Sequence, residues 1–92
     1  MTENYNVAAG LDIHKQFIIA TVLTISGLKF QQRFERTMQG LLALKYWILE
    51  HKCEVVACES TNNFWYQIYD ALCDNVTVIV GNPHDMKVLT HK

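Results

Sequence analysis

The 92-residue sequence has almost no excess of charge of either sign and no long hydrophobic run. Eight basic and nine acidic residues leave a net charge of −1. A domain that holds nucleic acid by itself usually carries a basic excess, so composition does not favour a stand-alone DNA-binding module. The longest apolar run, near Phe17–Leu23, is far shorter than the roughly 20 residues of a membrane-spanning helix. Because half of the residues are hydrophobic and only 18% are charged, we expect one folded domain and no membrane partner.

Cysteine is also scarce, with only Cys53, Cys58 and Cys73 in the chain. An odd number without paired spacing is not a disulfide framework, and the lack of any Cys-x-x-Cys pair argues against a zinc knuckle. We interpret all three as small buried hydrophobic side chains. The first residues lack the basic start and apolar core of a secretory signal, so we expect a cytoplasmic protein.

The first 35 residues show the pattern of three strands. The predicted strands are Val7–Asp12, which is mostly small and apolar, Gln16–Thr24, which is rich in β-branched and aromatic residues, and Leu28–Glu35, where apolar and polar residues alternate. The link between the first two is short enough for a hairpin, so that pair should be antiparallel. Gln32 interrupts the alternation of the third strand, which indicates either a bulge or an exposed edge.

Helices and strands alternate in the rest of the chain. The predicted elements are a helix capped by Thr37 that runs to Lys52, a strand at Glu54–Glu59, a helix capped by Ser60 or Thr61 with an apolar stripe of Trp65, Ile68, Tyr69 and Leu72, a strand at Val76–Val80, and the start of a helix at His84–Lys92 after Pro83. The nearly continuous apolar run of the fourth strand is typical of a strand covered on both faces. The order β-β-β-α-β-α-β-(α) predicts one α/β domain with a mixed sheet.

Two acidic residues end two of these strands. Asp12 follows Ala8 and Gly10 on one side of the first strand, and Glu59 closes the fourth. If these strands are parallel neighbours, both carboxylates lie at the sheet edge where α/β proteins bind ligands. Paired carboxylates repel unless a cation lies between them, and Mg²⁺ prefers oxygen ligands of this kind. The alternative is structural, with Asp12 beginning a turn and Glu59 reaching solvent beside a helix N-terminus.

Four sequence blocks carry a family resemblance. They are Gly10-Leu11-Asp12-Ile13-His14-Lys15, Gly40-Leu41-Leu42-Ala43-Leu44, Val55-Val56-Ala57-Cys58-Glu59-Ser60-Thr61 and Val80-Gly81-Asn82-Pro83-His84. In this order and at these separations, they resemble the N-terminal domain of the insertion-sequence one-ten family of transposases, also called DEDD transposases. The resemblance extends from about Val7 to Lys87.

The resemblance implies a ribonuclease-H-like fold of the RuvC type. It also implies that Asp12 and Glu59 are the first Asp and the Glu of a four-carboxylate site that holds Mg²⁺ or Mn²⁺, in two-metal form only in the complete domain. Family members are DNA transposases (recombinases) that cleave and join DNA strands, are thought to be guided by a structured RNA, and use a serine from a separate domain. By this resemblance the expected partners are DNA and a guide RNA.

The chain departs from the family pattern at two places. Asn62 and Asn63 follow the Glu-Ser-Thr block where the family usually has Gly, and the last two Asp of the site would lie beyond Lys92. We therefore expect residues 1–92 to be the N-terminal part of the catalytic domain, with half of the metal site. We expect this part to be inactive by itself.

Several other residues have two interpretations, and two other functions also fit the sequence. Lys15 and His84 are candidate contacts to substrate, although a solvated turn lysine and a surface histidine are the plainer interpretations. Lys29, Arg33 and Arg36 could hold a nucleic-acid backbone or could protect an exposed strand edge. Two alternative functions are a resolvase-like nuclease and a non-catalytic oligomerisation or RNA-docking module of the same fold. We also expect a homo-oligomer.

Overall fold

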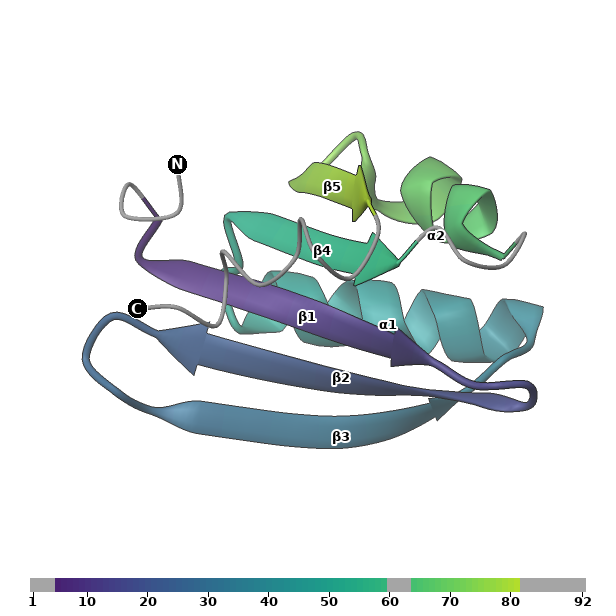
Figure 1. The fold of residues 1–92 in the computed structure, drawn as a ribbon, viewed down its shortest axis with the longest axis horizontal. Coiled ribbons are helices and arrows are strands. Elements are labelled where there is room, and N and C mark those ends of the chain that lie inside the picture. Colours follow the sequence, from purple (N-terminus) through teal and green to yellow (C-terminus); the bar gives the residue numbers. More distant parts are fainter. Residues whose placement is uncertain (1–4, 60–63, 82–92) are drawn as a thin grey trace.

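The computed structural model describes residues 5–59 and 64–81, which form a mixed five-stranded sheet with two helices (Figure 1). The strands are β1 (Val7–Ile13), β2 (Phe17–Thr24), β3 (Lys29–Glu35), β4 (Val55–Glu59) and β5 (Thr77–Gly81), and the helices are α1 (Met38–Glu50) and α2 (Trp65–Leu72). Across the sheet the order is β3-β2-β1-β4-β5. The pairs β1–β2 and β2–β3 are antiparallel, and β1–β4 and β4–β5 are parallel. The predicted α/β class is therefore confirmed.

The first three strands form a meander with short connections. The turn from β2 to β3 places Gly27 at φ 99°, a left-handed conformation that glycine adopts without a steric penalty. Thr24 closes this turn, because its backbone N–H donates to Leu28 O at 3.0 Å and its hydroxyl accepts from Leu28 N at 3.0 Å. In β3, Gln32 pairs with Ala20 in an unbroken ladder. Gln32 is exposed because β3 is the edge strand, so the edge interpretation is confirmed and no bulge forms.

Helix α1 begins close to the end of β3. Thr37 is its N-cap, as predicted, and its hydroxyl accepts a hydrogen bond from Gly40 N at 3.0 Å. Gly40 is buried against the backbone of Glu35, and a Cβ at this position would lie 2.7 Å from the Glu35 carbonyl carbon. Leu44 and Ile48 are fully buried beneath the sheet.

One face of the sheet packs against both helices and holds the main core (Figure 1). Its buried side chains are Ala9, Leu11, Ile18, Ala20, Val22, Phe34, Val56 and Cys58 from the strands, with Leu44, Ile48, Ile68 and Leu72 from the helices. On β4 the alternate residues Val55 and Ala57 face the other way and are also buried. The prediction that this strand is covered on both faces is thus confirmed.

Helix α2 differs from its prediction at two points. Its N-cap is Phe64, which makes no side-chain capping hydrogen bond, so the helix begins later than caps at Ser60 or Thr61 would allow. Tyr69 is 42% exposed, so the predicted apolar stripe is too wide. The predicted helix at His84–Lys92 lies outside the described residues. Neither described helix has the length and apolarity required to cross a bilayer.

Candidate active site

Asp12 and Glu59 come from adjacent parallel strands. The β1–β4 ladder pairs Gly10 with Ala57 and Leu11 with Cys58, and Asp12 and Glu59 are the next residues on each strand. Paired strands lie about 4.8 Å apart, and alternation puts both side chains on the sheet face opposite the two described helices. The prediction of a shared site required β1 and β4 to be parallel neighbours with both carboxylates at the same edge of the sheet. The structure meets this requirement.

Asp12 is held by a residue of the turn that follows β1. His14 Nε2 lies 2.9 Å from Asp12 Oδ2, and because an ionised carboxylate only accepts hydrogen bonds, Nε2 carries the proton. The His14 ring stacks on Phe17, with centroids 4.5 Å apart, and the guanidinium of Arg33 covers the same phenyl ring at 4.1 Å. The Asp12 side chain is 66% exposed, so Oδ1 remains open to a ligand from solvent.

Arg36 braces the hairpin tip that follows Asp12. Its Nη1 donates to the carbonyl oxygens of His14 and Lys15, both at 3.1 Å. Its guanidinium also lies 4.2 Å from the ring centroid of Phe64, next to the start of α2. One cation therefore links the β1–β2 turn to the helix that follows β4, and these two segments flank the candidate site.

The described residues supply donors suited to a hard divalent cation but not a complete site. Asp12 and Glu59 offer carboxylate oxygens, which fit Mg²⁺ or Mn²⁺ better than soft metals. Within residues 5–59 and 64–81, no group of three His, Cys, Asp or Glu side chains is placed to hold a metal ion. This pair could bind a cation only together with further ligands or water.

The other residues predicted to contact substrate or nucleic acid are found in different places. Lys15 is exposed in the turn between β1 and β2, and its role as a substrate contact stays a prediction. His84, Asn62 and Asn63 lie outside the described residues. Arg36 does not extend a basic strip along β3, because it turns toward the hairpin tip.

The buried thiols are unsuited to nucleophilic chemistry. Burial raises the pKa of Cys53 and of Cys58 to about 11, so both remain protonated at neutral pH. The prediction that the cysteines are buried is confirmed for these two and wrong for Cys73, which is exposed after the last turn of α2. Cys58 pairs with Leu11 next to Asp12, but its side chain lies in the core on the helix side of the sheet.

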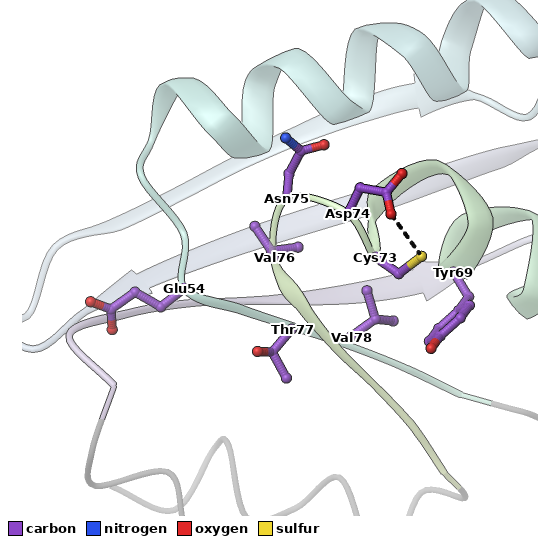
Figure 2. A pocket seen from close by; sticks show the side chains of 8 residues that line it. All are labelled: Glu54, Tyr69, Cys73, Asp74, Asn75, Val76, Thr77 and Val78. Atoms are coloured by element: carbon purple, nitrogen blue, oxygen red, sulfur yellow. Dashed lines mark hydrogen bonds between the residues drawn. The ribbon is translucent and has the colours of Figure 1, made fainter.

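A surface depression of about 450 Å³ surrounds Cys73 at the opposite edge of the sheet (Figure 2). It is lined by Glu54, Tyr69, Cys73, Asp74, Asn75, Val76, Thr77 and Val78. Glu54 and Thr77 lie at the amino ends of β4 and β5, whereas the candidate site lies at the carboxyl ends. The Cys73 thiol points to the carboxylate of Asp74, 4.0 Å away. The depression is therefore separate from the candidate site.

A second hollow of about 550 Å³ lies between the start of α1 and α2. Arg36, Thr37 and Phe64 are part of its wall, with Met38, Leu41, Gln67, Asp70 and Ala71 completing it. Because Arg36 also contacts the hairpin tip, this hollow lies at the same end of the sheet as the candidate site, but on the helix side. Its mixed lining offers apolar surface together with a cation and a carboxylate.

The contacts that two residues of the site make were not predicted from the sequence. The contact of His14 with Asp12 has a usable signal, because residues two apart on a strand share a face. The bracing role of Arg36 has none, because its partners are backbone carbonyls twenty or more residues earlier in the chain. Such contacts depend on the tertiary packing of the hairpin against β3 and α2.

Comparisons with known proteins identify a family model that matches the chain. The family model of the insertion-sequence one-ten (IS110) DEDD transposases, described as a transposase, matches residues 9–92. Among solved structures, the chain is similar to a Bacteroides thetaiotaomicron protein described as having an actin-like ATPase fold and unknown function, with a TM-score of 0.68 and 15% identity. The match covers 95% of this chain and 38% of that one, so the chain spans well under half of its neighbour. The comparison with curated proteins finds no match.

Proposed function

The chain belongs to the DEDD transposase family of the insertion-sequence one-ten type, and we infer that it contributes Asp12 and Glu59 to a metal site for DNA strand cleavage and joining. The complete protein would act on DNA, with a structured guide RNA as a further partner. The remaining ligands would come from residues outside the described ranges. We also assign the fold, within this proposal, to the ribonuclease-H-like class of the RuvC type.

One observation carries the proposal. The parallel ladder between β1 and β4 brings two carboxylates from distant parts of the sequence to neighbouring strand ends, on the face opposite the two described helices. Ligands of open α/β sheets bind beyond the carboxyl ends of such strands. A divalent cation held there would stabilise negative charge on a phosphodiester and orient it for attack.

The neighbouring residues have roles that do not involve contact with the metal. His14 donates to one Asp12 oxygen and so fixes the carboxylate rotamer, which leaves the second oxygen available. Arg36 holds the hairpin tip through two carbonyl oxygens and limits the movement of Asp12 relative to β4. Lys15, exposed at that tip, would place a positive charge near a bound phosphate.

Paramagnetic broadening by Mn²⁺ tests the carboxylate pair on the chain itself. In an NMR titration we expect the amide signals of Asp12, Ile13 and Glu59 to broaden first, because the ion would lie close to these groups. Asp12→Asn and Glu59→Gln should each abolish this selective broadening. Asp74→Asn is the matched control, since Asp74 is an exposed carboxylate at the opposite sheet edge, and it should leave the pattern unchanged.

Catalysis is tested in a longer version of the protein that continues past Lys92. Mg²⁺-dependent cleavage of DNA should be lost in Asp12→Asn and in Glu59→Gln and retained in Asp74→Asn. Equal broadening at all exposed carboxylates, or cleavage that persists without Asp12, would refute the proposed site.

A further inference from the structure

We propose that the outer edge of β3 pairs with the same edge of a second copy of this chain, in antiparallel orientation and centred on Gln32. The two sheets would then join into one continuous sheet across a two-fold axis. The inference does not rest on the carboxylate site, which lies at the strand ends on the far side of β2.

The hydrogen bonds between β2 and β3 identify which backbone groups of β3 are available. Thr24 N donates to Leu28 O at 3.0 Å, and Arg36 N donates to Gln16 O at 3.1 Å, so even-numbered residues of β3 bond to β2. In an antiparallel ladder the intervening residues direct their N–H and C=O groups the other way. The residues whose backbone groups point outward are Lys29, Gln31, Arg33 and Glu35. Since β3 is the last strand on its side of the sheet, no other described strand takes up these groups.

The charge pattern of the edge is complementary to itself in one register. Pairing centred on Gln32 places Lys29 opposite the partner's Glu35 and Gln31 opposite the partner's Arg33. All four residues direct their backbone groups outward, so each opposed pair can exchange two hydrogen bonds. Opposite charges across strands stabilise such pairing. The two-fold axis repeats the Lys29–Glu35 pair at the other end of the edge.

Other registers are unfavourable. A shift of two residues in one direction opposes Lys29 and the partner's Arg33, and a shift in the other direction opposes Arg33 to itself. Like charges directly across strands destabilise a sheet. A shift of one residue opposes outward backbone groups to inward ones and loses the hydrogen bonds. Charged residues on an exposed edge strand usually prevent it from pairing. On β3 they prevent only the neighbouring registers and leave the register centred on Gln32.

The helix side of the edge gives an independent observation. Phe30 is 39% exposed, and among the described residues its ring contact is His51, with centroids 4.7 Å apart. Phe34 is buried and meets Trp47 edge-on at 5.4 Å. The same register sets Phe30 opposite the partner's Phe34, in a pair without mutual hydrogen bonds, where Cα atoms approach to about 4.5 Å. The partner's Phe34 would cover the exposed ring of Phe30. This contact favours a second copy of the chain as the occupant of the edge.

Charge exchange at the two ends of the edge tests the pairing. Lys29→Glu opposes two glutamates across each end of the interface, and Glu35→Lys opposes two lysines. By sedimentation or light scattering over a range of concentrations, we expect the unaltered chain to dimerise and each single variant to dimerise at least about tenfold more weakly. An equimolar mixture of the two variants should form heterodimers, because each glutamate then faces a lysine.

The mixture also separates an interface effect from a folding defect, since misfolded variants would not associate when combined. Circular dichroism of each variant should match that of the unaltered chain, because both side chains are exposed. A monomeric unaltered chain at its highest soluble concentration would overturn the proposal. So would single variants that dimerise normally, or a mixture that associates no better than its components.

Discussion

Replacing Gly40 by alanine gives the most quantitative test of the packing between α1 and β3. The new Cβ would overlap the carbonyl oxygen of Glu35 and would lie 2.7 Å from its carbonyl carbon and 3.1 Å from its Cα. Non-bonded heavy atoms in contact normally lie about 3.5–4.0 Å apart, and the carbonyl oxygen is the nearest atom, so the start of α1 must move away from β3 by more than about 1 Å. The obstructing atoms belong to the backbone, so no side-chain rotation relieves the overlap.

The expected size of the effect follows from opposing contributions. Alanine is favoured over glycine in a helix by about 1 kcal/mol. Overpacking of this kind costs about 1–3 kcal/mol, and stretching the Thr37 hydroxyl bond to the Gly40 amide removes up to about 1 kcal/mol more. We expect Gly40→Ala to lower the free energy of unfolding by about 2 kcal/mol, which corresponds to roughly 10 °C in Tm for a domain of this size.

Urea denaturation followed by circular dichroism measures this change. Gln39→Ala is the matched control, because Gln39 precedes Gly40 on the same helix and is exposed, and it should alter stability by less than about 0.5 kcal/mol. A Gly40→Ala variant as stable as the unaltered chain would show that α1 does not approach β3 as closely as described.

Two further predictions concern the thiols and the hairpin brace. Because burial raises the pKa of Cys53 and Cys58 from 9.0 to about 11, their stabilising contribution is complete below pH 9 and falls as the pH rises through 11. Urea titrations from pH 8 to 11 should show this fall, and the double variant Cys53→Ala/Cys58→Ala should show a flatter pH dependence; an unchanged slope would contradict it. Arg36→Lys should lower stability by about 1 kcal/mol and increase hydrogen exchange at His14 and Lys15, because an ammonium cannot span two carbonyls and cover a ring as a guanidinium does; unchanged exchange at both amides would show that the brace is dispensable.

Much of the fold was predictable because its signals are local. Strand alternation, the Thr37 cap and the apolar run of β4 each depend on neighbouring residues, and each is found in the structure. The start of α2 was not predictable from capping residues, because its N-cap is the buried Phe64, which has no polar capping side chain. Tyr69 was misplaced since helical spacing indicates a face but not how far the sheet extends over it.

The candidate site was predictable only in part. Asp12 and Glu59 were chosen as strand-end acids, and the structure supplies the parallel ladder that relates them. Nothing in the spacing of the two residues determines that β4 returns beside β1 rather than beside β3. The contact between His14 and Asp12 has only the signal of a two-residue spacing, because it also depends on a side-chain rotamer. The bond from Arg36 to two carbonyls depends on tertiary packing and has no sequence pattern.

The parallel pairing of β1 with β4 affects how the chain folds while the ribosome is making it. The meander of β1, β2 and β3 closes through short turns and can form as soon as its residues leave the ribosome. The edge of β1 that faces β4 stays unpaired until α1 and β4 have been made, because a parallel strand can pair only after a long crossover connection. During that interval an apolar edge that includes Ala9 and Leu11 is unpaired. We expect substitutions that delay this closure to reduce the yield of folded protein through aggregation, before any effect on the assembled carboxylates could be measured.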